Sequence, residues 1–169
     1  MDVLLVDGYN IIGDWDELSR LRDKDLDQAR KLLIEKMAEY KAYRGYRVIV
    51  VFDAYEVKGL GSNEDQFGVE VIYTKEKETA DECIERLVKS LKNVKTKVYV
   101  ATSDYAEQRT IFQQGAYRKS ARELKLEVGH IQREILADLE DYQNKQSSRN
   151  PIIDAETWAA LERMRRGKD

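Results

Sequence analysis

Four aspartates stand where apolar segments of the sequence run out or where helical patterns begin. They are Asp7, Asp53, Asp81 and Asp104, in the settings VLLVDGYN, VIVVFDAY, KETADECIERL and VYVATSD. Strand ends meet along one edge of a parallel α/β sheet, so these carboxylates are expected to converge there. Converging carboxylates repel one another unless a cation lies between them, and Mg²⁺ and Mn²⁺ prefer oxygen ligands. The sequence therefore predicts a metal-dependent site for phosphoryl transfer or phosphodiester cleavage.

Each of these aspartates also has a simpler structural interpretation. Asp7 precedes a glycine, as turn aspartates often do, and Asp81 lies at a helix start, where an acidic side chain complements the helix dipole. Asp104 is placed to cap the following helix. The combination of all four, with Asn10 placed to orient a water or a phosphate oxygen, favours a catalytic site.

Apolar runs and helical spacing predict the elements that must position these residues. Strands are predicted over residues 3–6, 47–52, 69–73 and 97–101. Helices are predicted over about 25–43, from Thr79, from Ser103 or Asp104 to near Gly115, from Ser120 to about 142, and over 155–166. Residues 15–24 are expected as a short helix or ordered loop, 54–68 as a glycine-rich loop, and 143–150 as a polar break. This alternation predicts an α/β fold with a parallel sheet covered by helices on both faces.

Composition excludes several other kinds of site. Cys83 is the only cysteine, so neither an intrachain disulfide nor a cysteine-based zinc site is possible. His130 is the only histidine, which excludes a ribonuclease mechanism based on a histidine pair. The sequence shows no signal peptide pattern and no apolar run long enough to span a bilayer. We therefore expect a cytoplasmic protein with no membrane partner.

Two groups of basic and aromatic residues are candidates for RNA contacts. The first has Arg44 and Arg47 among closely spaced tyrosines, and the second follows Gly115 in an expected loop. The second group comprises Tyr117, Arg118, Lys119 and Arg122. Basic side chains contact phosphates and aromatic rings stack on bases, so both groups suit RNA. A solvated helix face with tyrosines in the core is the alternative interpretation of the first group.

The segments VDGYN, VFDA, ETADE and ATSD, in this order, resemble the NYN domain of the PIN-like nucleases. The later segment GAYRKSAREL is similar to the YacP-like branch of that family. The resemblance covers roughly residues 1–145 and implies a three-layer α/β/α fold with a central, mostly parallel sheet. It leaves residues 146–169 as a polar linker followed by a short basic helix.

The resemblance also implies an activity. It implies a Mg²⁺- or Mn²⁺-dependent endoribonuclease whose metal ligands are Asp7, Asp53, Asp81 and Asp104, with Asn10 beside them. Its products would carry 5′-phosphate and 3′-hydroxyl ends. The YacP-like branch further implies cleavage of mRNA in association with the translating ribosome, at the A site.

Two other functions remain open at this point. A receiver-like signalling domain also places aspartates at strand ends and binds Mg²⁺, but the first strand here lacks an acidic pair. A module that binds RNA or the ribosome without catalysis is the other alternative. The sequence leaves the oligomeric state and the cleavage motif open.

Overall fold

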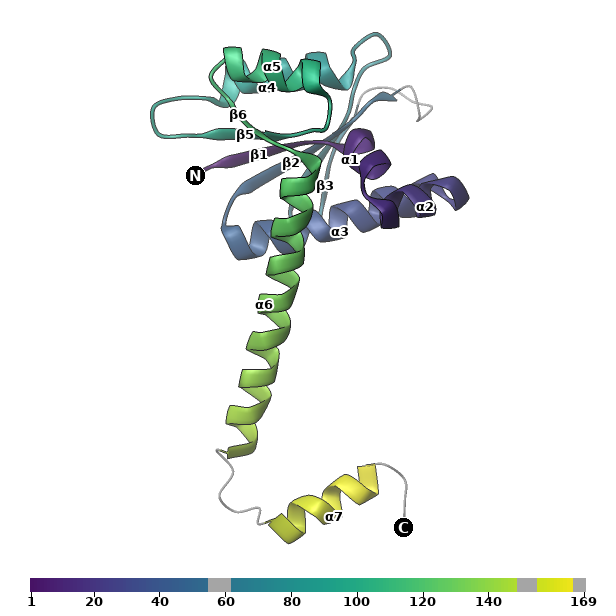
Figure 1. Cartoon of the computed structure of the whole chain (residues 1–169), viewed down its shortest axis with the longest axis vertical. Helices are drawn as coiled ribbons and strands as arrows, with labels where there is room; N and C mark the ends of the chain where they lie inside the picture. The colour runs from purple at the N-terminus through teal and green to yellow at the C-terminus, as the bar shows by residue number, and fades with distance from the viewer. Residues whose placement is uncertain (55–61, 149–154, 166–169) are drawn as a thin grey trace. The chain divides into compact units, whose positions relative to one another are not determined.

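The computed structural model describes residues 1–54, 62–148 and 155–165, and within these ranges the chain forms one sheet and several helices (Figure 1). The strands are β1 (Val3–Asp7), β2 (Arg47–Phe52), β3 (Ser62–Gln66), β4 (Val69–Tyr73), β5 (Val98–Ala101) and β6 (Tyr117–Lys119). The helices are α1 (Gly8–Asp14), α2 (Asp16–Lys24), α3 (Leu26–Arg44), α4 (Ala80–Leu91), α5 (Tyr105–Gln113), α6 (Ala121–Ser148) and α7 (Ala155–Arg165).

The sheet is mostly parallel, with strand order β3-β4-β2-β1-β5-β6. Strand β1 is central and pairs in parallel with β2 and β5, while only β3 runs antiparallel to its neighbour β4. Helices α4 and α5 lie on one side of the sheet and α1 to α3 on the other (Figure 1). The predicted three-layer α/β/α fold is therefore confirmed.

The alternation of side chains along the strands divides the core between the two faces. Val3 and Leu5 of β1 belong to one cluster with the buried residues of α4 and with Ile111 of α5. The next side chain along, Leu4, is also fully buried and points to the opposite face, as the strand period requires. At the edge where β1 ends, helix α1 begins in one layer and helices α4 and α5 begin in the other.

Local sequence signals fix where several helices begin and end. The Thr79 side chain accepts a hydrogen bond from the Glu82 backbone N–H at 3.1 Å, and Ser120 does the same for Glu123 at 3.0 Å. Gly45 ends α3 with φ +73°, a left-handed conformation that glycine adopts without steric cost. The predicted starts of α4 and α6 and the predicted end of α3 are confirmed.

Three expectations about local structure were wrong, and one helix was not predicted. The unpredicted helix is α1, which begins directly after Asp7. Residues 62–66 of the expected loop form the edge strand β3. Residues 55–61 of that loop lie outside the described residues. Residues 117–119 pair with β5 as β6 and are not a loop. Helix α6 continues through 143–148, because a solvated helix tolerates a polar run such as QNKQSS without an apolar face.

The chain divides into two compact units, Met1–Ile131 and Gln132–Asp169. The first contains the sheet and the four predicted aspartates. The second contains the C-terminal part of α6 and helix α7. The predicted domain boundary near residue 145 stays a prediction. Among the described helices there is none whose length and apolar character would suit a bilayer span.

Gly8 is required by the close approach of α1 to β2. A Cβ atom at residue 8 would lie 2.3 Å from the Phe52 ring, which is fully buried between Tyr9 and Tyr73. We expect Gly8→Ala to lower the free energy of unfolding by about 1–3 kcal/mol, measured by urea denaturation. Gly13→Ala in the same helix is the matched control, because its Cβ would meet only the flexible end of Arg22. Equal stability of the two variants would contradict this account.

Candidate active site

Three carboxylates meet where β1, α4 and α5 come together. Asp7 ends β1, Asp81 lies in the first turn of α4, and Glu107 lies in the first turn of α5. One oxygen from each carboxylate lies within 4.8 Å of the other two. Asp7 and Glu107 are buried, with 7% and 4% of their surface exposed, and Asp81 is half-buried. The predicted convergence of Asp7 and Asp81 is thus seen in the structure.

Sequence reasoning did not find Glu107. An acidic residue in the first turn of a helix is usually interpreted as a partner of the helix dipole. The signal that marks Glu107 is its spacing of three residues from Asp104, which caps α5. Asp104 Oδ1 accepts hydrogen bonds from the backbone N–H groups of Ala106 and Glu107, at 3.0 and 3.2 Å. That cap fixes the first turn of α5 and therefore the position of the Glu107 side chain.

Thr102 joins two of the three carboxylates through one hydroxyl group. Its Oγ1 lies 3.3 Å from Asp7 Oδ2 and 3.0 Å from Glu107 Oε2. Thr102 is fully buried, and its Oγ1 also accepts a hydrogen bond from the Asp104 backbone N–H at 3.1 Å. A hydroxyl carries one proton, so it donates to only one of these acceptors at a time. The remaining negative charge needs either another proton or a cation.

Burial makes this charge costly in the absence of a cation. Burial raises the pKa of Asp7 to about 6, and the neighbouring charge of Asp81 adds to that effect. Burial also raises the pKa of Glu107, with the charge of Asp7 as the next cause. Without a cation, both carboxyl groups therefore keep a proton to higher pH than an ordinary carboxyl group does.

A divalent cation fits this group of residues. Glu107 Oε1 is buried and has no hydrogen-bond partner within the described part of the chain. An orphaned carboxylate oxygen beside two further carboxylates is a donor set that Mg²⁺ or Mn²⁺ prefers. Asp7, Asp81 and Glu107 are accordingly the residues that would hold the ion.

Asn10 is fixed beside the carboxylates by the segment that follows β5. Its side-chain oxygen accepts hydrogen bonds from the Ser103 hydroxyl at 2.6 Å and from the Ser103 backbone N–H. Thr102 Oγ1 lies 3.3 Å from the same oxygen. The Asn10 amide oxygen is thus used in contacts within the protein, and the amide nitrogen is the group that can donate a hydrogen bond to a ligand.

Asp53 and Asp104 lie at the same edge but outside the three-carboxylate group. Asp53 Oδ2 accepts a hydrogen bond from the Ala80 backbone N–H at 3.4 Å, at the start of α4. Asp104 caps α5, as the structural interpretation of its sequence position predicted. The predicted metal-binding roles of both residues stay predictions.

The residues predicted to contact RNA have different surroundings. Lys119 and Arg44 form ion pairs with Glu127 of α6, and Arg47 forms a two-pronged ion pair with Glu70 of β4. The other three, Tyr117, Arg118 and Arg122, are exposed. Of these, Arg118 also donates a hydrogen bond to Gln108 of α5, and the Tyr117 ring packs against the Tyr99 ring. The predicted roles in RNA binding stay predictions, and the exposed residues suit them best.

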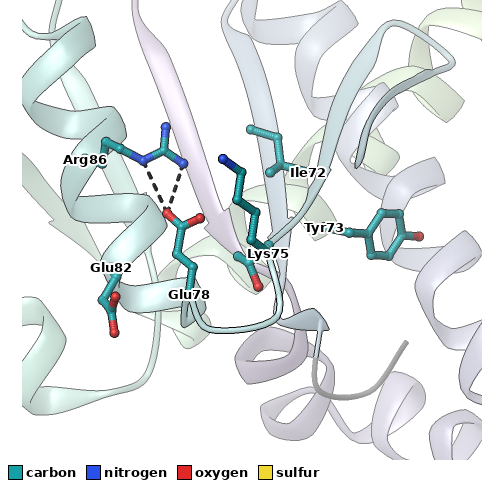
Figure 2. Close-up of a pocket in the computed structure, with 7 residues that line it drawn as sticks. Ile72, Tyr73, Lys75, Glu78, Glu82 and Arg86 are labelled. Carbon is teal, nitrogen blue, oxygen red and sulfur yellow. Dashed lines mark hydrogen bonds and ion pairs between the residues drawn. The ribbon is translucent and has the colours of Figure 1, made fainter. Parts of the chain in front are cut away.

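A pocket of about 720 Å³ lies between the end of β4 and helix α4 (Figure 2). It carries charges of both signs. Arg86 donates through Nε and Nη2 to Glu78 Oε1, at 3.2 and 2.9 Å, as the dashed lines in Figure 2 mark. Glu82 and Lys75 also line it. Its mixed and partly neutralised charge does not select an anion or a cation.

The raised pKa values predict how a metal ion stabilises the protein. The pKa of Asp7 is near 4 in the unfolded chain and about 6 in the folded protein. Between these two pH values the unfolded chain releases the proton that the folded protein keeps, so the metal-free protein should lose stability as pH rises through this range. An ion requires the deprotonated ligands, so its stabilising effect should grow over the same range.

We expect saturating Mn²⁺ to raise the thermal unfolding midpoint more at pH 8 than at pH 5. An ion present at 100 times its dissociation constant stabilises by about 2.7 kcal/mol, which corresponds to several degrees. Asp16→Asn, in the first turn of α2, is the control and should show the same dependence. An equal shift at both pH values would contradict the assignment of Asp7 as a ligand.

Comparison with known proteins agrees with this fold and identifies the family. The sequence matches the family described as YacP-like NYN domain over residues 4–166. A curated relative, described as uncharacterized protein YacP of Bacillus subtilis (strain 168), is 51% identical over 167 residues, or 99% of this chain and 98% of the relative.

Two crystal structures of Rae1 (YacP) from Bacillus subtilis are also similar. One matches with a TM-score of 0.77 at 51% identity and covers 99% of this chain and 96% of that chain. The other, of a mutant, matches with a TM-score of 0.77 at 53% identity over 85% of each chain. This agreement favours a nuclease over a receiver-like domain. The chain belongs to the YacP-like NYN domain family, a family of PIN-like nucleases.

Proposed function

We propose that this protein is a metal-dependent endoribonuclease that cuts mRNA in association with the translating ribosome. The observation that carries the proposal is the group formed by Asp7, Asp81 and Glu107, in which Glu107 Oε1 is buried and has no hydrogen-bond partner among the described residues. Family membership supports the nuclease activity, because PIN-like nucleases generally use divalent metal ions.

The residues of the chain bind and orient the reacting groups. Asp7, Asp81 and Glu107 would hold Mg²⁺ or Mn²⁺, and the Thr102 hydroxyl group keeps the Asp7 and Glu107 carboxylates in place. A bound ion supplies positive charge to the phosphate and lowers the pKa of a coordinated water. Asn10, held by Ser103, presents its amide nitrogen to a phosphate oxygen.

The reaction is hydrolysis of a phosphodiester. The water oxygen forms a new bond to phosphorus while the bond from phosphorus to the 3′-oxygen breaks. The 3′-oxygen takes up a proton as it leaves, so the products carry a 5′-phosphate and a 3′-hydroxyl. No histidine is needed, which agrees with a chain whose single histidine, His130, is exposed on α6.

The charges of the protein support a partner in RNA binding. The net charge is −3, and three of the basic residues predicted to meet RNA pair with acidic side chains of the protein itself. Few phosphate contacts mean weak binding to free RNA and loss of that binding as salt rises. A ribosome that presents the mRNA would remove this need for high intrinsic affinity.

The test follows end-labelled mRNA with Mg²⁺, both free and on translating ribosomes, using the wild type beside Asp7→Asn. The variant is the necessary control, because withdrawal of Mg²⁺ would itself dissociate the ribosomes. Cleavage by the wild type alone, and only on ribosomes, supports the proposal in full. Cleavage of free RNA as well would replace it with a general endoribonuclease. Absence of cleavage in both reactions would favour a module that binds RNA or the ribosome without catalysis.

A further inference from the structure

A cleft of about 460 Å³ runs along one face of α5 and reaches β6. Its lining includes Tyr105, Arg109 and Phe112, which share a helix face because side chains three, four and seven residues apart stack above one another. Gln108 is buried at its floor, and Arg118 closes it from β6.

Two aromatic side chains of this cleft are directed to solvent. Tyr105 is 77% exposed and Phe112 is 71% exposed. Within the described residues, neither ring has an aromatic or cationic neighbour in contact. Exposed apolar groups in a row along a groove mark a binding surface more often than isolated ones do. The two ring faces are therefore available to stack on a flat partner.

The charge of the cleft selects an anionic partner. Its lining contains two arginines and no acidic residue. Arg109 takes part in no ion pair among the described residues, and Arg118 makes a hydrogen bond to neutral Gln108 at 3.2 Å. The pocket in Figure 2 differs, because Glu78 already neutralises its Arg86.

The cleft is connected to two of the three carboxylates by hydrogen bonds. Gln108 accepts from Arg118 and donates to the Thr102 backbone oxygen at 2.6 Å, and the Thr102 hydroxyl contacts Asp7 and Glu107. Gln108 also directly follows Glu107 in α5. The cleft thus lies on the same helix whose first turn carries Glu107, and Gln108 links the two.

We propose that this cleft binds unpaired nucleotides of the substrate RNA that lie outside the carboxylate group. The bases stack on Tyr105 and Phe112, and a phosphate pairs with Arg109. Stacking requires single-stranded RNA, because the faces of paired bases are covered by their neighbours. This surface would discriminate little between RNA sequences, because every base offers a flat face for stacking. This inference rests on the proposed function and adds the substrate site to it.

Binding of fluorescent, single-stranded oligouridylate tests the proposal. The full chain carries Asp81→Asn in every sample, so that the RNA stays intact. We expect Tyr105→Ala and Phe112→Ala each to weaken binding about tenfold, while Tyr105→Phe and Phe112→Tyr, which keep the rings, restore it. Arg109→Ala should lower the slope of affinity against salt by about one. Tyr142→Ala, at an exposed tyrosine of α6, should bind as the parent does.

Photocrosslinking of 4-thiouridine-labelled mRNA on ribosomes gives an independent readout, with crosslinks expected on the peptide that contains Tyr105 and Phe112. Parent-like binding by both alanine variants, crosslinks only elsewhere, or equal competition by duplex RNA would each overturn the proposal. Loss of binding by these variants in a protein that cuts no RNA would instead defeat the proposed function and leave the binding site standing.

Discussion

Replacing Glu107 by glutamine is expected to make the metal-free protein more stable and, at the same time, to remove RNA cleavage. Glutamine has the shape of the protonated glutamic acid side chain but needs no proton, so folding no longer has to raise the pKa of a carboxyl group at this position. Its amide can donate to Asp7, as the protonated acid can. The same change deletes a ligand of the ion, so stability and activity should move in opposite directions.

Thermal unfolding in EDTA and cleavage of ribosome-bound mRNA are the two measurements. Each kcal/mol recovered should raise the unfolding midpoint by roughly 2–4 °C. Added Mn²⁺ should then stabilise Glu107→Gln much less than the wild type. Glu123→Gln is the matched control, because Glu123 holds the equivalent first-turn position in α6 but is exposed. A Glu107→Gln protein that is destabilised in EDTA, or that still cuts normally, would refute the assignment.

Asparagine substitutions should separate the metal ligands from the residues that only support them. We expect Asp7→Asn and Asp81→Asn each to reduce cleavage by more than about 10²-fold, beyond the usual effect of losing a group that merely orients a ligand. Asp104→Asn should reduce it only about tenfold. Asparagine caps a helix as well as aspartate does, so α5 keeps its start and Glu107 keeps its place.

The three variants are compared at matched folded fraction, checked by circular dichroism, with cleavage rates measured over a range of Mn²⁺ concentrations. A requirement for more Mn²⁺ in Asp7→Asn or Asp81→Asn marks a ligand. Should Asp104→Asn prove as inactive as Asp81→Asn, then Asp104 binds an ion as the sequence pattern implied, and the group of three is too small.

Much of the fold was visible in the sequence because its signals are local. The buried parallel strands are continuous apolar runs, and residues such as Thr79 and Ser120 mark helix starts within four positions. Asp7 and Asp81 were found because strand ends and helix starts meet at one edge of such a sheet. Strand β3 was missed because its sequence, SNEDQ, has no apolar alternation and forms only through pairing with β4.

The rest of the site depended on contacts between distant parts of the chain. Glu107 resembles an ordinary first-turn acid until α5 is placed against β1. The sequence did not predict that Glu127 accepts from Lys119, eight residues away, and from Arg44, 83 residues away. Tyr40 donates to the same carboxylate at 3.1 Å. Such a group of partners follows from packing and not from spacing in the sequence.

The central position of β1 has a consequence for synthesis of the protein. β1 is made first, yet its neighbours β2 and β5 come from much later in the chain. Asp7 leaves the ribosome roughly 5–20 s before Glu107 at ordinary translation rates. The three carboxylates cannot assemble until α5 has emerged, so the nascent chain has no complete metal site while most of it is being translated. Timing alone thus keeps this proposed nuclease inactive beside its own message for that period.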